Sequence, residues 1–245
     1  MLMNPTLDKL YALRLTGMAK AYKEQEQMKD IEELTFENRF GLLVDTEMTE
    51  RENRRLTSRL RNAKLRQNAC IEDIDLRYQR GLDKHLLPQL GSCQWIKDHL
   101  NVLLTGPTGI GKSYIACALA QSACRQGYKS LYKRLPRLFE ELGIAKGDGR
   151  YGKLLTNLSK TDLLVLDDFG LSKLTEEQCR DLLEIIEDRH RLKSTIVTSQ
   201  LPVKNWHDVM KDPTLADAIL DRLVHNAYKI ELTGESMRKE KKPLT

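Results

Sequence analysis

The chain has 245 residues, of which 40% are hydrophobic and 31% are charged, and its formal net charge at pH 7 is +5. This length allows a full α/β core with a small additional domain. No run of 18 apolar residues occurs, which excludes a membrane-spanning helix, and the modest positive charge only weakly favours an anionic partner.

The first twenty residues and the cysteines both indicate a cytoplasmic protein. Residues 1–20 place charged residues such as Asp8, Arg14 and Lys20 among the leucines, so they lack the apolar core of a signal peptide. The cysteines are odd in number and lack C-x-x-C spacing, which is typical of reduced, mostly buried thiols. They are Cys70, Cys93, Cys117, Cys124 and Cys179.

Residues 1–66 are expected to form a small all-α domain that binds DNA or a partner. Apolar residues at mixed three- and four-residue spacing predict a first helix between residues 7 and 18. A second helix is predicted from about residue 35 to residue 66. The residues expected to be buried on this second helix are Phe36, Phe40, Leu43, Val44, Leu56 and Leu60.

The end of this second helix concentrates positive charge. Between Arg51 and Arg66 there are seven cations and one acid, Glu52, a net charge of +6. Like charges at helical spacing repel each other, so the phosphate backbone of DNA is the expected neutralising partner, with a solvated helix face as the alternative. The expected DNA-binding residues are Arg51, Arg54, Arg55, Arg59, Arg61, Lys64 and Arg66.

Residues 67–99 are expected to form a linker and the lead-in to an ATPase domain over residues 100–245. From residue 101 onward, apolar strands alternate with helical segments, which predicts a parallel α/β sheet. Strands are expected at 101–105, 129–133, 162–167, 195–199 and 227–232, with helices beginning near Lys112, Pro136, Glu176 and Leu215. Thr175 and Gln178 form a capping box before the third of these helices.

The first predicted strand runs into GPTGIGKS, a match to the GxxxxGK[ST] phosphate-binding loop, or P-loop. Glycines let the loop wrap a polyphosphate, and the N–H groups at the start of the following helix face its oxygens. Lys112 adds a charge for the β- and γ-phosphates, and the Ser113 hydroxyl is a ligand for Mg²⁺. We expect ATP to bind here, at Gly106, Pro107, Thr108, Gly109, Ile110, Gly111, Lys112, Ser113 and Tyr114.

A second acidic motif, LLVLDDFG at residues 163–170, is expected to complete the site. Four apolar residues predict a buried parallel strand, and ligands of open α/β sheets bind at the carboxyl ends of such strands. Our hypothesis is that Asp167 orders Mg²⁺ and that Asp168 polarises the attacking water. The alternative is an ordinary Asp-rich turn at the end of a strand.

Two further residues are candidates for catalysis, together with Lys112 and Asp168. Gln200 follows the fourth predicted strand, where it would contact the γ-phosphate or the water, or else be a turn residue before Pro202. Arg222 is near the end of a predicted helix, either as a helix C-terminal charge or as an arginine supplied to a neighbouring subunit. The five histidines lack metal-binding spacing.

Other cations extend the possible DNA track beyond the N-terminal helix. Lys129, Lys133, Arg134 and Arg137 surround the second strand, and three more follow in a predicted loop; a solvated surface is the alternative. The three loop residues are Lys146, Arg150 and Lys153. Because no base-reading element is visible, we expect binding to duplex DNA with little sequence specificity.

Taken together, these motifs resemble the AAA+ ATPases of the helicase-loader and initiator type, and within them the IstB family of insertion-sequence transposition helpers. The resemblance covers nearly the whole chain. Its blocks are residues 37–56 with 63–66, residues 69–75, residues 163–170, and residues 215–225 with 234–238.

The resemblance implies a P-loop sheet flanked by helices and a homo-oligomer with ATP between subunits. It also implies that Arg222 acts on a neighbour's site and that Gln200 is a first sensor. Two departures are notable. Asp168 stands where many relatives place Glu, so slow hydrolysis is expected. Thirteen residues follow Leu232, so no full C-terminal lid is expected, and Arg238 would be a partial substitute for the second sensor.

Three functions remain open at this point. The resemblance favours an ATP-dependent transposition helper that assembles on target duplex DNA, bends it and recruits a transposase. The alternative is a DnaC-like helicase loader that acts on a replicative helicase. A small-molecule P-loop kinase is the least favoured, since no acceptor pocket is recognisable.

Overall fold

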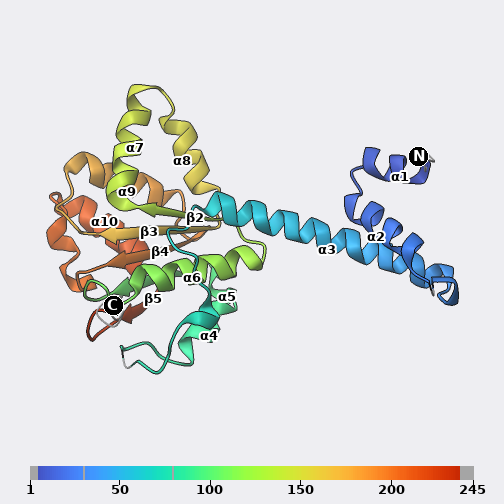
Figure 1. Ribbon diagram of the computed structural model, residues 1–245. Helices are drawn as coiled ribbons and strands as arrows, with labels where there is room; N and C mark the ends of the chain where they lie inside the picture. The colour runs from blue at the N-terminus through green and yellow to red at the C-terminus, as the bar shows by residue number, and fades with distance from the viewer. Residues whose placement is uncertain (1–4, 30, 79, 238–245) are drawn as a thin grey trace, which may run out of the picture. The chain divides into compact units, whose positions relative to one another are not determined.

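The computed structural model describes residues 5–29, 31–78 and 80–237 (Figure 1). The chain divides into two compact units, Met1–Ser58 and Arg59–Thr245, and the division falls within one long helix, α3 (Phe36–Ala63). None of the described helices combines the length and the apolarity that crossing a bilayer requires.

The first unit is helical and packs through small residues. Helices α1 (Pro5–Ala12) and α2 (Thr16–Gln27) precede a 3-10 turn at Ile31–Glu33 and the greater part of α3. A Cβ atom on Gly17 would lie 2.6 Å from the Cα of Glu47, so only glycine lets α2 and α3 approach this closely. The buried residues of α2 are Gly17, Ala19 and Ala21, which make a narrow contact stripe.

The expected burial of two aromatic residues on α3 is wrong. Phe36 is 71% exposed and Phe40 is 49% exposed, and their rings stack on each other with centroids 6.0 Å apart. Leu43, Val44, Leu56 and Leu60 are only partly buried. The cause is the narrow contact made by α2, whose buried residues are all small and cover one line along α3. Although Gln25 Nε2 donates to the carbonyl of Arg39 at 2.8 Å, both aromatic rings lie outside this line.

Glu47 on α3 is buried and caps the start of α2. Its carboxylate accepts hydrogen bonds from the backbone N–H groups of Gly17 at 2.7 Å and Met18 at 3.2 Å, and from Arg51 Nε at 2.6 Å. Burial alone would raise the pKa of Glu47. The hydrogen bonds from Arg51, Met18 and Gly17 outweigh that effect, so the pKa is lowered from 4.5.

Glu47→Gln is therefore expected to destabilise the first unit by about 1–2 kcal/mol, because charge-assisted bonds to a helix N-terminus are lost. The stabilisation from Glu47 should be complete above its unfolded pKa of 4.5 and should disappear as the pH falls through the lower folded pKa. Hydrogen exchange of the α2 amides against pH measures both effects. Glu50→Gln is the control, since the one ion pair that Glu50 forms within the described residues is exposed, with Lys20 at 3.7 Å. Equal losses in the two variants would contradict the capping role.

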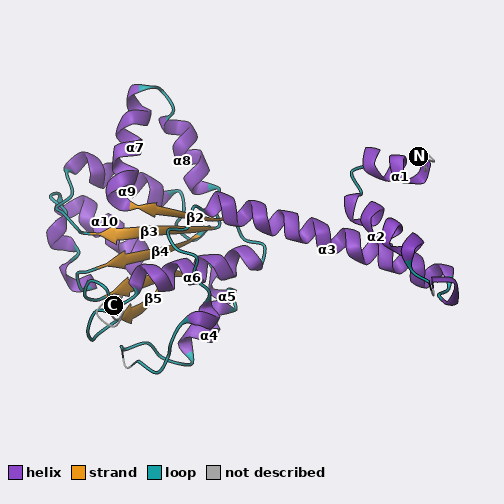
Figure 2. Ribbon diagram, in the orientation of Figure 1, coloured by secondary structure: helices purple, strands orange, loops and turns teal. Residues whose placement is uncertain are grey.

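The second unit contains a five-stranded parallel sheet (Figure 2). The strands are β1 (Asn101–Thr105), β2 (Ser130–Arg134), β3 (Leu163–Phe169), β4 (Ser194–Ser199) and β5 (Ala227–Glu231), in the order β2-β3-β4-β1-β5. Since all the pairs are parallel, the carboxyl ends of the strands meet at one edge. The segments that follow β1 and β3 therefore meet at that edge.

Helices cover both faces of the sheet, as the alternation of buried strand residues requires. Val102 and Leu104 face a core with α6 (Lys112–Arg125), whereas Leu103 faces a core with α7 (Leu135–Gly147) and the later helices. These later helices are α8 (Tyr151–Ser159), α9 (Glu176–Glu187) and α10 (Pro213–Val224).

The expected strands and helix starts of this unit are confirmed to within about two residues. The loop expected to carry Lys146, Arg150 and Lys153 is wrong in its extent, because Lys146 lies in α7 and Lys153 lies in α8. The capping box is present, with the Gln178 N–H donating to Thr175 Oγ1 at 3.2 Å and the Thr175 N–H donating to Gln178 Oε1 at 3.0 Å. The largest shifts are two residues: α10 begins at Pro213 instead of near Leu215, and β3 continues beyond Asp167 through an irregular pairing with β4 between Leu166 and Phe169.

The segment expected to be a linker packs into the second unit. Ala69, Ile74 and Trp95 belong to the same core as α6, next to the short helices α4 (Leu86–Gly91) and α5 (Gln94–Lys97) and the 3-10 turn Ile71–Asp73. All five cysteines are free thiols, and all except Cys70 are buried.

Candidate nucleotide site

The loop between β1 and α6 has the conformation that a phosphate-binding loop needs. Gly106, Gly109 and Gly111 have φ angles of +140°, +84° and +103°, a region that favours glycine. A Cβ atom on Gly106 would lie 2.2 Å from the carbonyl oxygen of Leu232, so the chain after β5 also excludes a side chain. Gly111 is the N-cap of α6 and provides no side-chain cap, so no N-cap side chain would compete with a phosphate for the first N–H groups of the helix.

Lys112 lies back over this loop. Its Nζ donates to the carbonyl oxygens of Gly106 at 2.6 Å and Pro107 at 2.8 Å. These carbonyls hold the ammonium group beside the turn that would surround the phosphates. Of the other expected nucleotide-binding residues, Pro107 and Thr108 are exposed, whereas Ile110 is buried in the core and anchors the loop.

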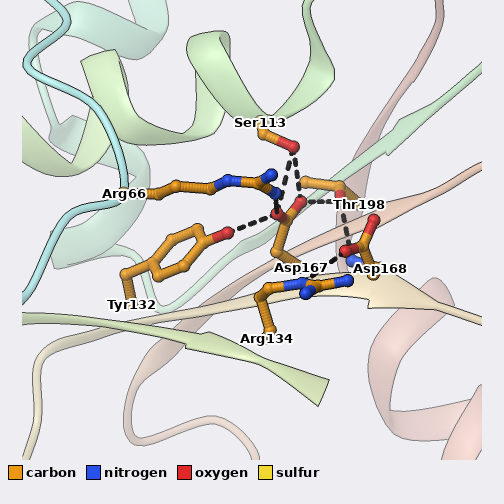
Figure 3. Close-up of polar contacts among 7 residues, drawn as sticks. All are labelled: Arg66, Ser113, Tyr132, Arg134, Asp167, Asp168 and Thr198. Carbon is orange, nitrogen blue, oxygen red and sulfur yellow. Dashed lines mark hydrogen bonds and ion pairs between the residues drawn. The ribbon is translucent and has the colours of Figure 1, made fainter. Parts of the chain in front are cut away.

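Asp167 is fully buried and lies at the centre of a polar cluster (Figure 3). Ser113 Oγ is 2.8 and 3.0 Å from its two carboxylate oxygens, and the hydroxyls of Tyr132 and Thr198 also donate to it. Arg66 Nη1 is 3.5 Å from Asp167 Oδ2. Burial and the neighbouring carboxylate raise the pKa of Tyr132, so its hydroxyl keeps its proton and remains a donor.

The donor set at Asp167 and Ser113 fits Mg²⁺. A carboxylate and a hydroxyl, held together at the N-terminus of α6, are hard oxygen ligands of the kind that this ion prefers. Within residues 5–29, 31–78 and 80–237, no group of three or more His, Cys, Asp or Glu side chains could hold a metal. The rest of the metal shell would therefore come from water and phosphate oxygens, as is usual for Mg²⁺.

Asp168 has a different environment from its neighbour. It lies at the irregularity in β3 with φ +66°, a conformation that costs a non-glycine residue free energy and that is often found at functional sites. Its N–H donates to Thr198 Oγ1 at 3.2 Å, and its half-buried carboxylate accepts from Arg134 Nε at 2.7 Å. The bulge thus points the second carboxylate away from the Asp167 cluster, towards the end of β2.

Gln200 and Arg222 lie at opposite ends of the parallel strands, Gln200 at the carboxyl ends and Arg222 at the amino ends. Gln200 is exposed and lines a groove of about 380 Å³ with Gly106 and Pro107, next to the P-loop. The carbonyl of Arg222 accepts from Asn101 Nδ2 at 3.2 Å, which places it at the start of β1. Since β1 spans roughly 13 Å at about 3.3 Å per residue, Arg222 is far from the phosphate-binding edge of its own subunit.

The side chain of Arg222 is engaged locally. Its Nη1 donates to the carbonyl of Ala218 at 2.9 Å, and its Nε forms an ion pair with Glu187 on α9. About a quarter of the side chain remains exposed, so the guanidinium lies at the surface of this edge of the unit.

The residues expected to bind DNA do not form one uniform surface. Arg51 and Arg54 form ion pairs with Glu47, at 2.6 and 3.6 Å. Arg59 Nε donates to the carbonyl of Cys124 at the end of α6, at 2.8 Å. Arg66 differs most from the expectation, because α3 ends at Ala63 and Arg66 extends to Asp167.

Arg55, Arg61 and Lys64 are exposed, and the described part of the chain offers none of them an ion pair. They are therefore the members of the expected set that remain available to an external anion.

Sequence reasoning missed Tyr132, Thr198 and the position of Arg66. Tyr132 and Thr198 are polar residues inside buried strands that flank β3, a signal that has meaning only once the strand order is known. Arg66 gives no such signal, because its charge resembles that of the helix before it.

The comparisons with known proteins agree with this geometry. The sequence profile of the family described as IstB-like ATP binding protein matches residues 8–245. The chain is 51% identical to a putative insertion sequence ATP-binding protein, y4pL, of Sinorhizobium fredii, over 99% of both chains. It is 50% identical to the putative ATP-binding protein of insertion sequence IS1162 from Pseudomonas fluorescens, over 82% of this chain and 88% of the relative.

Solved structures share the fold over the larger part of this chain. DnaI matches with a TM-score of 0.58 at 24% identity, over 68% of this chain and 92% of DnaI. The DnaC helicase loader matches with a TM-score of 0.55 at 20% identity, over 70% of this chain and 100% of that structure. The replication initiator DnaA, bound to AMPPCP and single-stranded DNA, matches with a TM-score of 0.57 at 16% identity, over 70% and 52% of the two chains. These likenesses confirm the expected fold class.

Proposed function

This chain belongs to the family of IstB-like ATP-binding proteins, and from that membership we propose that it is an ATP-dependent helper of insertion-sequence transposition. The family and the AAA+ P-loop fold make it an ATPase. In the proposed function, the protein assembles on target duplex DNA in its ATP-bound state, bends the DNA and recruits a transposase.

One observation carries the proposal. The phosphate-directed loop and the Ser113–Asp167 oxygen pair meet at a single sheet edge, in a chain whose full-length relatives are insertion-sequence ATP-binding proteins. In the proposed site, Lys112 and the first N–H groups of α6 hold the phosphates, while Ser113 and Asp167 hold Mg²⁺. When bound there, Mg²⁺ would supply charge neutralisation for the phosphates, and Asp168 would orient the attacking water.

The position of Arg222 supports assembly. A cation at the edge of the sheet opposite the P-loop cannot serve its own nucleotide, but it can serve the nucleotide of a neighbouring subunit in a head-to-tail assembly. ATP between subunits would then stabilise the assembly by mass action. Bending a short DNA site costs on the order of 1–6 kcal/mol, which phosphate contacts from several subunits can offset.

The test compares DNA binding by the wild type and by Lys112→Ala with ATP, with ADP and without nucleotide. The wild type is expected to bind duplex DNA cooperatively only with ATP, to lose affinity steeply as salt rises and to bring the ends of a labelled duplex closer together. Lys112→Ala should lack the ATP effect, whereas Lys160→Ala, an exposed lysine at the end of α8, should behave as the wild type. DNA affinity that is indifferent to nucleotide would contradict the proposal.

The helicase-loader alternative is supported by fold alone. DnaI and DnaC share the fold at 24% and 20% identity, whereas the insertion-sequence relative shares 51% identity over nearly its full length. A pull-down with the transposase of the same element and with a replicative helicase separates the two functions. Capture of the helicase alone would favour the loader.

A further inference from the structure

Two groups of cations that are far apart in the sequence line one hollow in the second unit. The hollow has a volume of about 340 Å³ and is open to solvent. Lys64 and Arg66 enter it from the segment after α3, and Lys133, Arg134 and Arg137 enter it from the junction of β2 and α7. The cations thus come from both stretches that the sequence marked as possible DNA tracks.

The charges of this basic hollow are only partly compensated. Arg66 pairs with Asp167, Arg134 pairs with Asp168, and Lys133 pairs with Glu141. Lys64 and Arg137 are exposed, and neither forms an ion pair with a residue in the described part of the chain. Five cations therefore face three carboxylates, which leaves the hollow with a net positive charge.

The start of α7 strengthens the attraction for an anion. Its first turn contains no acidic residue, and Arg134 and Arg137 lie at the N-cap and in the first turn instead. Cations at a helix N-terminus are disfavoured by the helix dipole, so an anion bound there relieves the repulsion as well as pairing with the side chains.

We propose that the basic hollow binds a backbone phosphate of duplex DNA, and that this phosphate draws Arg66 away from Asp167. The inference rests on the proposed function, which requires DNA and nucleotide to bind together. Lys64 and Arg137 supply the charges that are not already paired, and Arg66 exchanges one anionic partner for another.

The exchange at Asp167 couples DNA binding to metal binding. A metal ion at this site would be bound by the carboxylate that Arg66 Nη1 already contacts, at 3.5 Å from Oδ2. The positively charged guanidinium would therefore compete with the metal for Asp167. A phosphate that binds Arg66 removes this competitor. Because coupling between two binding sites is reciprocal, bound metal and nucleotide must raise the affinity for DNA by the same factor.

The first test neutralises the unpaired cations. Lys64→Gln combined with Arg137→Gln should weaken duplex binding about tenfold in the presence of ATP and should reduce the salt slope by about 1 to 2. Nucleotide affinity without DNA should be unchanged. The control, Lys97→Gln combined with Lys160→Gln, removes the same charge from exposed lysines without ion pairs elsewhere on the described part of this unit.

The second test follows the metal directly, with Mn²⁺ binding measured by electron paramagnetic resonance in the presence of a non-hydrolysable ATP analogue. In the wild type, duplex DNA should raise Mn²⁺ affinity about tenfold. Arg66→Gln should bind Mn²⁺ more tightly without DNA and should lose the DNA effect, while Arg66→Lys should retain part of it. Inorganic phosphate in place of DNA should not reproduce the effect at millimolar concentration.

The outcomes distinguish failure of this inference from failure of the proposed function on which it rests. If the wild type fails to bind duplex DNA with ATP, the proposed function itself fails. If it binds, but the Lys64 and Arg137 double variant binds equally well, the hollow is not a DNA site. A double variant that loses ATP affinity without DNA would assign the hollow to the nucleotide and would also overturn the inference. An unchanged DNA effect on Mn²⁺ in Arg66→Gln would remove Arg66 from the coupling.

Discussion

Asp168→Asn is expected to leave ATP binding intact and to lower kcat for ATP hydrolysis by about two to four orders of magnitude. The carboxylate of Asp168 lies at the same sheet edge as the P-loop but outside the Asp167 cluster, so its loss should not disturb the metal ligands. An amide occupies the same space but cannot accept a proton from water. The variant should therefore retain its ATP affinity while losing ATP hydrolysis.

The measurement pairs single-turnover hydrolysis with equilibrium binding of a fluorescent ATP analogue. Asp208→Asn, at an exposed position in the 3-10 turn His207–Val209 before α10, is the matched control and should hydrolyse ATP as the wild type does. Asp167→Asn is expected to differ from Asp168→Asn by losing Mg²⁺-dependent binding as well. Unchanged turnover in Asp168→Asn would remove this carboxylate from the mechanism.

Hydrolysis by the wild type is itself expected to be slow. The Asp168 side chain is one carbon shorter than Glu, and its carboxylate is held by Arg134 at 2.7 Å. Orienting a water molecule requires this ion pair to rearrange. Because the pair is partly exposed, its rearrangement costs at most about 1 kcal/mol, which slows turnover without preventing it.

The sheet and the P-loop were predictable because local rules determine them. Apolar strands such as 163–166 are buried on both faces, and the glycines before Lys112 identify a turn without knowledge of the rest of the fold. Their positive φ angles agree with that turn. The surroundings of Asp167 were harder to predict from the sequence. Tyr132 and Thr198 come from strands on either side of β3, so their convergence depends on the strand order β2-β3-β4.

The charge or hydrophobicity of a residue was the poorest guide to its contacts where its partner comes from a distant segment of the chain. Arg59 and Arg66 resemble the other arginines of α3, but one donates to the carbonyl of Cys124 and the other pairs with Asp167. Phe36 and Phe40 follow a helical pattern whose partner helix buries only small residues. Arg238, the expected partial substitute for a second sensor, lies outside the described residues. A periodic pattern gives the face of a helix but not the element that covers it.

Arg222→Ala is expected to lower kcat by about three orders of magnitude while leaving each subunit folded. An arginine supplied across an interface to a transferring phosphoryl group typically contributes a factor of this size. Within the subunit, the substitution removes the ion pair with Glu187 and a hydrogen bond to the carbonyl of Ala218. Since Glu187 is about half exposed, removing the ion pair should cost less than about 1 kcal/mol of stability.

Mixing two inactive variants decides whether Arg222 acts on a neighbour. An Asp168→Asn subunit retains Arg222, and an Arg222→Ala subunit retains Asp168. If Arg222 acts across the interface, about a quarter of the interfaces in an equal mixture combine both intact groups, and hydrolysis should return to about that fraction of wild type. If Arg222 acts on its own site, no subunit in the mixture has both groups and activity stays absent. Arg222→Lys separates charge from geometry: it can retain a partner in Glu187, but it cannot present a guanidinium to the γ-phosphate, so it should restore stability without restoring hydrolysis.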